Sequence, residues 1–565
     1  MILDKILFLL IIFLKIFLFP TSQSTDFEVH RNWKSITNTL PISEWYFYSD
    51  NKWTLDYPPL FAYMEYVLGK ISKFFDSNIT NITKFNYDSI KCIIFLRTTV
   101  LLGDVFLFFS INFLCKALNL PFIKYFILLF SIQFYAGLVI IDNMHFQYNG
   151  ILFGLLLISI GFIAKKKYIF GAIFYFVCLC MKHIFIYFAP AYFIFYLKYI
   201  IINNIKKKRF KFLIKKVILI GLSFCIILII TFLPFIAISI RDKNLDQFIQ
   251  IKNRLFPVQR GLLHTYWAPN FWALYSFIDK IFYFSYTKKF PFLKDICSIL
   301  LKYKGNNNIN EKRNISSLGS TENGVSKETG FDILPDIDIK KTNIIIIMFI
   351  LIYFIKYFYF EKKKNKKEKI KNNKIKEFIK HCICFNLIFF NFGYQVHEKA
   401  FLNISILSII YYIITVHKEI KIIKKDKEEL KEKKYFSDIL TKLSLMIVIE
   451  GIVAQLPLIH EAKDYLVKVG ITLFYIFVSK AILFNKNNNS IIMAFINFRI
   501  ISYVILSLVL DFLITFQKHF NIDSNLFLMK ILNYIKNRYS FLYLLLFSIN
   551  GAILTQIIFI ILLIY

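Results

Sequence analysis

Long apolar runs separated by polar connections dominate this sequence. The runs are 14 to 25 residues long, and an α-helix needs roughly 20 apolar residues to cross a bilayer. A first run lies at 6–20, and the others lie at 92–115, 124–141, 150–164, 168–181, 184–202, 217–240, 342–360, 378–394, 400–416, 441–456, 465–484, 491–515 and 541–565. The pattern predicts an all-α polytopic membrane protein with a bundle of about 14 transmembrane helices.

Two long polar segments divide the chain into five parts. We expect a first transmembrane helix (1–20), a long loop that carries short helices (21–91), a helical block (92–240), a second long loop (241–341) and a second helical block (342–565). The run at 6–20 also fits the apolar region of a secretory signal peptide, but the following PTSQST contains no obvious A-x-A-like cleavage site. We therefore favour a retained first helix. Within the second loop, the Gly-, Ser- and Asn-rich stretch 305–330 is typical of disorder.

Composition and charge exclude other classes of protein. With 57% apolar residues the chain is too hydrophobic for a disordered protein. The 70 basic and 36 acidic residues give a net charge of +34, and 24 of the basic residues lie in 203–216, 361–376 and 417–434. Short basic loops between apolar runs mark the cytoplasmic side of a membrane rather than a nucleic-acid surface.

Alternation of the spans puts the remaining connections on the opposite, lumenal side. They include 21–91, with seven basic and eight acidic residues, the turn at 142–150, the Lys182 region, 241–341 and the turn at 395–399. Sequons at Asn78, Asn81 and Asn314 would then face the glycosylation machinery. Seven of the eight cysteines lie in or beside apolar runs, whereas Cys297 has polar neighbours, so the sequence predicts neither a disulfide framework nor a metal site.

The stretch STDFEVHRNW, residues 24–33, follows the first apolar run. Thr25 and Glu28 have the spacing of a capping box, which predicts a helix that starts at Asp26 and places Asp26 and His30 one turn apart on the same face. A carboxylate in the first turn of a helix is stabilised as the anion, so Asp26 can accept a proton. Alternatively, Asp26 only stabilises the start of the helix, and Glu28 is already occupied by the capping box.

The stretch WTLDYPP, residues 53–59, presents a second carboxylate, Asp56. Two prolines stop any preceding helix and fix the turn, so Asp56 either recognises a polyhydroxyl ligand or simply occupies a turn. The same loop contains Trp33, Trp45 and Trp53. Tryptophans of this kind serve as membrane-interface anchors or as platforms for sugar rings.

Two further stretches combine ionisable and aromatic residues. RLFPVQRGLLHTYWAPNFWALY (254–275) contains Arg254, Arg260, His264 and Trp267, which suit a lipid-linked phosphate, although snorkelling arginines look similar. FGYQVHEKA (392–400) places His397, Glu398 and Lys399 at a membrane boundary, where such groups need partners or a ligand. Lys182 and His183 form a weaker signal of the same kind.

These motifs together closely resemble those of the endoplasmic-reticulum α-1,3-glucosyltransferases that use dolichyl-phosphate-glucose, which are members of the GT-C superfamily. The similarity covers roughly residues 24–400 and is carried by TDFEVHRNW, LPISEWYF, WTLDYPPLFA, HFQYNG, KHIFIYFAPAY, RLFPVQRG, HTYWAPNFWALY and VHEKA. Within the family, HTYWAPNFWALY and FEVHRNW look like the enzymes that add the second glucose to the lipid-linked oligosaccharide. The enzymes that add the first glucose carry a different, acidic sequence after RLFP-x-x-RG.

The resemblance implies an inverting transfer of glucose from dolichyl-phosphate-glucose to a monoglucosylated dolichyl-diphosphate oligosaccharide, at the lumenal face of the endoplasmic-reticulum membrane. Asp26 corresponds to the catalytic aspartate, and His397 and Lys399 lie in the turn near the phosphate. The other candidate substrate-binding residues are Glu28, His30, Arg31, Asp56, Arg254, Arg260, His264 and Trp267. Dolichyl phosphate is already a good leaving group, so no metal or other cofactor is expected.

The first-glucose enzyme of the same family remains as an alternative, as do two other classes of membrane protein. A secondary transporter or lipid scramblase would show repeats and ionisable residues at the middle of the membrane, but this sequence shows no repeat and concentrates its motifs in the predicted lumenal loops. A structural membrane scaffold would not need Asp26, Asp56 and the VHEK turn on one side of the membrane.

Overall fold

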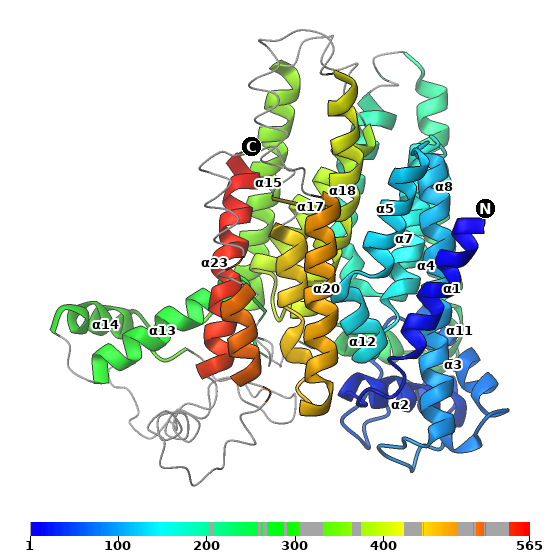
Figure 1. Ribbon diagram of the computed structural model, residues 1–565, viewed down its shortest axis with the longest axis horizontal. Helices are drawn as coiled ribbons and strands as arrows, with labels where there is room; N and C mark the ends of the chain where they lie inside the picture. The colour runs from blue at the N-terminus through cyan, green and yellow to red at the C-terminus, as the bar shows by residue number, and fades with distance from the viewer. Residues whose placement is uncertain are drawn as a thin grey trace. The chain divides into compact units, whose positions relative to one another are not determined.

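Every regular element that the structure describes is helical (Figure 1). The structure is a computed structural model. It describes residues 2–202, 205, 208–257, 261–263, 268–287, 291–304, 331–363, 374–422, 443–444, 446–483, 501, 504–513, 515 and 542–564.

Seven of the described helices are long and apolar enough to cross a membrane. They span Ile90–Ala117, Phe122–Met144, His183–Ile202, Phe210–Asp242, Ile339–Tyr359, Glu398–Thr415 and Tyr543–Leu563. Five shorter apolar helices lie at Ile6–Ile16, Asn149–Ala164, Tyr168–Met181, Met446–Leu458 and Val504–Leu513. The prediction of an all-α polytopic membrane protein is therefore confirmed, while the count of about 14 spans stays a prediction.

The chain divides into two compact units, and each is described by itself. The first covers residues 1–257 with 372–382 and 409–422, and the second covers 258–371, 383–408 and 423–565. The α-helices of the first unit are α1 (Ile2–Ile16), α2 (Thr25–Thr39), α3 (Pro59–Ser72), α4 (Ile90–Ala117), α5 (Phe122–Gln133), α6 (Ala136–Leu138), α7 (Asn149–Ala164), α8 (Tyr168–Met181), α9 (Ala189–Tyr196), α11 (Phe210–Asp242) and α12 (Asp246–Leu255). Short 3₁₀ or π turns, η1 (Ile42–Glu44), η2 (Ser77–Thr80), η3 (Val139–Met144), η4 (His183–Phe188) and η5 (Leu197–Ile202), connect them.

Small residues let α4 and α7 pack closely. A Cβ atom added at Gly150 would lie 3.2 Å from the backbone carbonyl of Gly103, and one added at Gly154 would lie 2.5 Å from the ring of Phe106. Gly150 and Gly154 have the G-x-x-x-G spacing that permits close approach of two membrane helices. The contact fixes the start of α7, which matters because the polar segment 145–149 ends there.

A buried ion pair ties α1 to α4. The ammonium of Lys15 contacts the carboxylate of Asp104 at 2.5 Å, and both side chains are 2% exposed. Asn143 donates a second hydrogen bond to Asp104, at 2.9 Å. Lys15, which interrupts the first apolar run, thus has an ionic partner inside the helical bundle.

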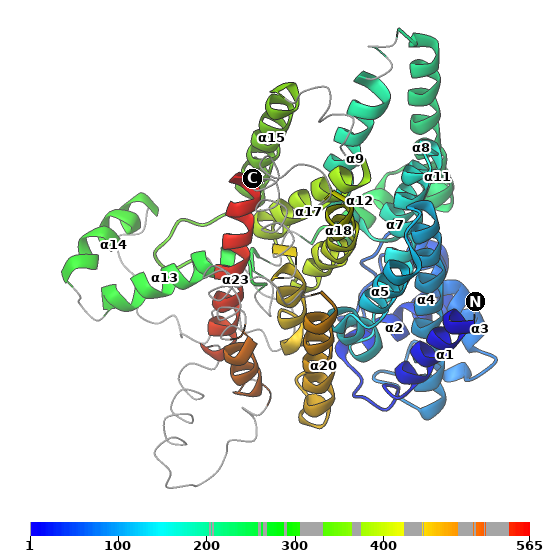
Figure 2. The same cartoon turned by 45° about the horizontal axis from the view of Figure 1, so that its top comes forward.

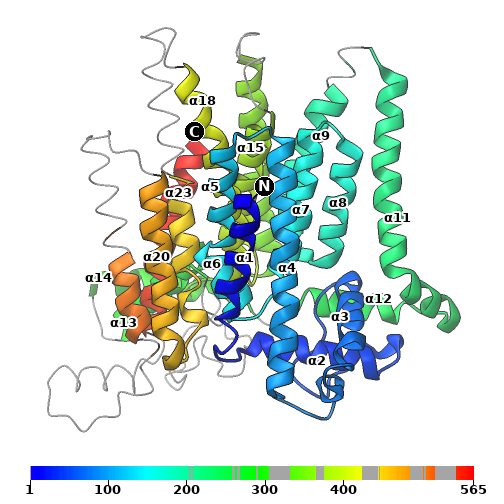
Figure 3. The ribbon, with the colours of Figure 1, turned by 45° about the vertical axis from the view of Figure 1, so that its right-hand side comes forward.

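Helices α2, α3 and α12 lie at one end of the first unit (Figure 3). Figure 3 shows α2 crossing the end of α4, with α3 and α12 nearby. In contrast, α11 runs along the edge of the unit (Figure 3), and only 6% of its most apolar 18-residue stretch is buried. An apolar helix that exposed is covered by lipid in a membrane.

The second unit contains α13 (Phe271–Thr287), α14 (Pro291–Lys304), α15 (Ile339–Lys363), most of α17 (Lys374–Phe392), η8 (Glu398–Ala400), the first part of α18 (Phe401–Ile422), η9 (Leu456–Leu458), η10 (Ala462–Asp464), α20 (Tyr465–Leu483) and α23 (Leu542–Ile564). In Figure 2, α13 and α14 extend away from α15 and α23. Cys297 on α14 is fully buried against Leu301 and Ile333, whereas Cys225 on α11 is exposed. The polar neighbours of Cys297 in the sequence therefore lie on the other face of an amphipathic helix.

Candidate active site

Helix α2 starts one residue earlier, and with a different cap, than the sequence predicts. The N-cap is Ser24, whose hydroxyl accepts a hydrogen bond from the N–H of Phe27 at 3.4 Å. Glu28 pairs with Arg31 instead of completing a capping box. The predicted Thr25–Glu28 box is therefore wrong, because a buried guanidinium three residues along the helix is a stronger partner for Glu28 than a backbone N–H. The helix ends at Thr39, and the next residue, Leu40, is extended because Pro41 follows it.

Asp26 lies in the first turn of α2, and two side chains from the segment 145–149 converge on its Oδ2 atom. The side-chain amide of Gln147 donates a hydrogen bond at 2.6 Å. The Nδ1 atom of His145 lies 3.2 Å away. The carboxylate of Asp26 is 18% exposed, whereas the His145 side chain is 5% exposed. The carboxylate is thus held from one side by protein donors and remains partly accessible, as a general base must be.

A buried charged network lies one turn further along α2. The ring Nδ1 of His30 contacts Oε1 of Glu65 at 2.7 Å, and the ammonium of Lys34 contacts Oε2 of the same carboxylate at 2.6 Å. Lys34 also donates to the hydroxyl of Tyr148 at 3.1 Å, and that hydroxyl lies 2.7 Å from the hydroxyl of Thr99. The network joins α2, α3, α4 and the segment 145–149, and therefore fixes the orientation of the helix that carries Asp26.

Burial and neighbouring charges shift the pKa values of His30, Lys34 and Glu65 in opposite directions. Burial lowers the pKa of His30 below its usual 6.5, and the hydrogen bond and charge of Glu65 do not reverse that shift. Burial acts to raise the pKa of Glu65, but Lys34 and His30 outweigh it and hold that pKa below its usual range. Burial likewise opposes the charge of Lys34, whose pKa is raised overall by Glu65 and Tyr148. We infer a neutral imidazole beside a Lys34–Glu65 ion pair.

Asp56 lies on the loop before α3, which begins at Pro59. Its carboxylate is partly exposed, and its negative charge disfavours ionisation of the neighbouring Tyr57 hydroxyl. Burial raises the pKa of Tyr57 well above its usual value, and the charges of Asp56 and then Asp26 raise it further. The ammonium of Lys182 lies 4.9 Å from the centre of the Tyr57 ring. Tyr57 therefore lies in the field of both predicted carboxylates.

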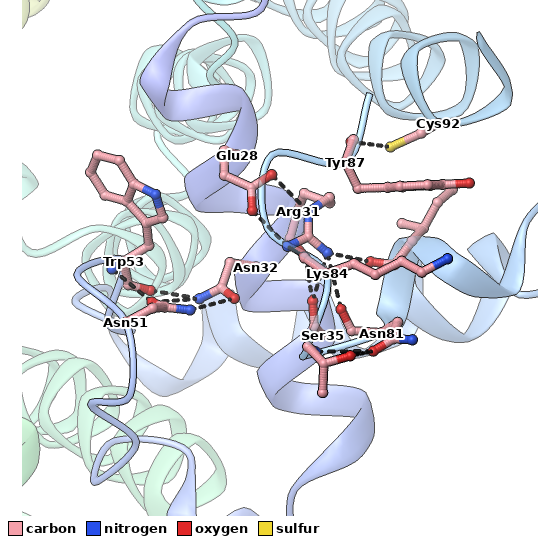
Figure 4. Close-up of polar contacts among 12 residues, drawn as sticks. Glu28, Arg31, Asn32, Ser35, Asn51, Trp53, Asn81, Lys84, Tyr87 and Cys92 are labelled. Atoms are coloured by element: carbon pink, nitrogen blue, oxygen red, sulfur yellow. Dashed lines mark hydrogen bonds and ion pairs between the residues drawn. The ribbon is translucent and has the colours of Figure 1, made fainter. Parts of the chain in front are cut away.

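Glu28 and Arg31 hold two parts of the first loop together. Arg31 is fully buried and forms a two-point ion pair with Glu28, with distances of 2.6 and 2.7 Å. Its remaining N–H groups donate to the hydroxyl of Ser35 and to the carbonyls of Ile79, Asn81 and Lys84 (Figure 4). This geometry uses all the donor groups of the guanidinium. It favours a structural role for both residues over the predicted contact with substrate.

The tryptophans of the first loop are mainly core residues. Trp33 is 2% exposed and Trp45 is 4% exposed. The indole N–H of Trp33 donates to the carbonyl of Thr54, and that of Trp45 to the carbonyl of Leu40. For these two residues both predicted roles, interface anchor and sugar platform, are wrong, because the ring of Trp33 is buried against Tyr57 and Phe61 and the ring of Trp45 against Tyr63 and Tyr66. Trp53 is partly exposed, and Lys52 lies over its ring.

Arg254 lies in the last turn of α12 and binds the first loop. Its guanidinium donates to the carbonyls of Tyr46 and Tyr48 at 2.9 and 3.2 Å. Gln250, one turn earlier, also donates to the carbonyl of Tyr46. Arg260, His264 and Trp267, predicted from the same stretch of sequence, lie outside the described residues.

His397 and Lys399 belong to the second unit, in the turn between α17 and α18. Both side chains are partly exposed, and Glu398 between them is buried. The preceding turn is held by Leu262 and Trp272. Gln395, which has a left-handed backbone (φ 51°), donates its N–H to the carbonyl of Leu262, and the indole of Trp272 donates to the carbonyl of Gly393. The structure thus brings together two stretches that the sequence singled out separately.

The sequence reasoning missed four residues of this site. His145 and Gln147 contact Asp26, and Lys34 and Glu65 form the buried ion pair. HFQYNG carries part of the family resemblance, but no local pattern indicates that it contacts Asp26, which is 121 residues away from Gln147. Lys34 and Glu65 look like ordinary surface residues of amphipathic helices, and the pairing becomes visible when α2 and α3 are packed together.

Comparison with known proteins shows which family this chain resembles. The profile of the ALG6, ALG8 glycosyltransferase family matches residues 11–562. A relative from Saccharomyces cerevisiae is 35% identical over 471 residues, which is 81% of this chain and 74% of the relative. A relative from Kluyveromyces lactis is 33% identical over 80% of this chain and 75% of its own length. A mouse relative is 42% identical over 279 residues, which is 47% of this chain and 52% of the relative.

All three relatives are described as dolichyl pyrophosphate Glc1Man9GlcNAc2 alpha-1,3-glucosyltransferases. The matched region of the family profile contains both units and every candidate residue discussed above. This chain therefore belongs to the ALG6, ALG8 glycosyltransferase family.

Proposed function

We propose that this protein transfers the second glucose, in α-1,3 linkage, to the monoglucosylated dolichyl-diphosphate oligosaccharide, with dolichyl-phosphate-glucose as the donor. The observation that carries the acceptor assignment is the likeness to the Saccharomyces cerevisiae relative, whose description specifies Glc1Man9GlcNAc2, over 81% of this chain. The Asp26 site supports the reaction type, because a partly exposed carboxylate that accepts a hydrogen bond from Gln147 and lies 3.2 Å from His145 suits a general base.

In the proposed mechanism, Asp26 accepts the proton of the acceptor 3-hydroxyl. The hydroxyl oxygen attacks the anomeric carbon of glucose as the bond from that carbon to the phosphate oxygen breaks. The electron pair of that bond leaves with dolichyl phosphate. One displacement inverts the β-linked donor into an α-linked product. Asp56, on the loop beside Tyr57, would then bind hydroxyl groups of the acceptor.

The departing phosphate needs positive charge near it. His397 and Lys399 supply a partly exposed imidazole and ammonium in the turn that Gln395 and Trp272 support. We assign this turn to the donor phosphate. The proposal also includes a GT-C-like bundle of about 14 transmembrane helices in the endoplasmic-reticulum membrane, with the site on the lumenal side.

The test of acceptor identity is complementation. The chain is expressed in cells that lack the enzyme for the first glucose or the enzyme for the second, and the lipid-linked oligosaccharides are analysed by mass. We expect the monoglucosylated species to disappear in the second strain and the unglucosylated species to persist in the first. The opposite result would assign the protein to the first-glucose reaction, and no change in either strain, with the protein stably expressed, would contradict the glucosyltransferase assignment.

Replacing His397 or Lys399 by alanine should slow glucosyl transfer about 10- to 150-fold. The reason is the loss of a charge-assisted contact, which is worth about 1.5–3 kcal/mol. Transfer by the purified protein is measured at several donor concentrations, with the exposed Lys463→Ala as the matched control. Unchanged turnover and unchanged donor affinity in both variants would show that the turn serves packing.

A further inference from the structure

The segment 145–149 carries a hydrogen-bonded chain that ends on Asp26. Gln147, which is 7% exposed, donates its amide N–H to Oδ2 of Asp26 at 2.6 Å. Its amide oxygen accepts two further hydrogen bonds, from the side-chain amide of Asn149 at 3.0 Å and from the ammonium of Lys182 at 3.3 Å. Gln147 therefore links the candidate base to a lysine on the other side of the amide.

The partners of Gln147 allow its amide one orientation. An ammonium group donates hydrogen bonds and cannot accept them, whereas a carboxylate accepts them and cannot donate. Lys182 must therefore face the amide oxygen of Gln147, and Asp26 must face its NH₂ group. A flipped amide would place two donors against each other and an oxygen against a carboxylate.

A second amide of the same polarity reinforces this arrangement. The NH₂ group of Asn149 donates to Oδ1 of Asp142 at 2.8 Å as well as to Gln147, and its oxygen accepts from Lys182 at 3.3 Å. The other oxygen of Asp142 accepts the backbone N–H of Gly150 at 2.7 Å, at the close contact between α4 and α7. The chain from Asp142 to Asp26 is thus anchored in the helical bundle, and its last link is the N–H that Gln147 donates to the carboxylate of Asp26.

We propose that Gln147 is a positioning residue that keeps Asp26 oriented and ionised before the proton is transferred, and that Lys182 and Asn149 set the polarity of its amide. This inference rests on the proposed role of Asp26 as the general base. A hydrogen bond donated to a carboxylate stabilises the charged form, so removal of the donor makes Asp26 more basic and protonates it at a higher pH.

Other ionisable groups near Asp26 are His30 on the same helix, His145 beside Oδ2, Tyr57 on the loop before α3, and Lys182 behind Gln147. His30 and His145 both titrate near neutral pH when exposed. The Gln147 variants leave all four groups in place. A change in the pH profile that is specific to those variants therefore reports the lost donor.

The experiment measures kcat/KM for glucosyl transfer as a function of pH, with full-length protein in lipid nanodiscs. In Gln147→Leu the pH at which kcat/KM rises, as Asp26 loses its proton, should increase by about 1–2 units. Above that pH, kcat/KM should recover toward the parental value. Gln147→Glu, which puts a second carboxylate against Asp26, should shift the pH of this rise further. Lys182→Met should shift it in the same direction by less. The matched control is Gln250→Leu, another glutamine that donates a side-chain hydrogen bond, which should keep the parental profile.

A uniform loss of rate with an unshifted profile in the Gln147 variants would overturn the positioning role and leave Gln147 as a structural residue. Should Gln147→Leu fail to accumulate, the isosteric Gln147→Glu and the distant Lys182→Met decide the question by the same criterion. Retained activity in Asp26→Asn would instead overturn the proposed base, so the two failures are distinguishable.

Discussion

Asp26→Asn should leave a folded, membrane-inserted protein with almost no glucosyl transfer. Asparagine has nearly the same shape, and its side-chain oxygen can still accept the hydrogen bond from Gln147. Ser24 caps the helix, so the cap is unaffected. What is lost is the proton acceptor, and loss of a general base costs about 10²–10⁴-fold in rate. Transfer by the purified variant and its thermal unfolding are the two measurements.

The alternative role of Asp26 predicts the opposite pattern. If the carboxylate only stabilises the start of α2, the variant loses at most about 1 kcal/mol of stability and transfers glucose normally. Asp56→Asn is the companion variant: a residue that binds the acceptor should lose activity partially, and a higher acceptor concentration should restore it. A dead Asp56 variant beside a fully active Asp26 variant would move the base to Asp56, and two active variants would refute the mechanism.

Glu65→Ala should destabilise the first unit by about 3–5 kcal/mol, because it leaves a buried ammonium without its counter-ion. Glu65 and Lys34 are both fully buried, and the carboxylate also binds His30. The free energy of unfolding is measured by denaturant titration in detergent micelles. The matched control is Asp242→Ala, which breaks an exposed ion pair with Arg241 and should leave stability unchanged.

A double replacement separates the cost of burying a lone charge from the value of the ion pair. Lys34→Met with Glu65→Leu removes both charges and keeps much of the volume, so it should recover most of the stability that Glu65→Ala loses. A double variant as unstable as the single one would mean that packing around the pair, and not the unpaired charge, determines the loss.

The same network predicts how stability depends on pH. The pKa of His30 is lowered in the folded protein, so below the usual value of 6.5 the unfolded chain binds a proton that the folded chain does not. Stability should therefore be complete above pH 6.5 and fall as the pH falls. Glu65, whose pKa is also lowered, adds a second loss below its usual 4.5. His30→Gln should remove the decline that begins near pH 6.5 and keep the more acidic one.

Much of the fold follows from local patterns. Apolar runs predicted the positions of α4, α15 and α23 to within three residues, because a helix that faces lipid must be apolar along its length. Helix α11, in contrast, begins seven residues before its predicted run. Prolines mark two helix boundaries: α3 begins at Pro59, and α2 ends two residues before Pro41. The cap of α2 was predicted wrongly, because Glu28 is drawn to a guanidinium that is itself buried by contacts with residues 79–84.

The candidate site divides in the same way. The sequence by itself pointed to Asp26, Asp56 and the turn with His397 and Lys399, because paired charges beside apolar spans are unusual and because the motifs resemble one family. It also singled out Arg31 and Trp33, which the structure shows as buried and fully engaged. A sequence pattern records the type of residue at a position and does not record whether its polar atoms are already used.

What the sequence by itself determined, therefore, is an all-α polytopic membrane protein, the loop that carries Asp26, and the family. The tertiary structure alone decided the partners of Asp26 and of His30: Gln147 is 121 residues from Asp26 along the chain, and Glu65 is 35 residues from His30. The physical reason is one of range. Helix formation and capping depend on neighbours within about four residues, whereas a hydrogen bond or ion pair between helices exists because packing excludes water and holds distant segments together.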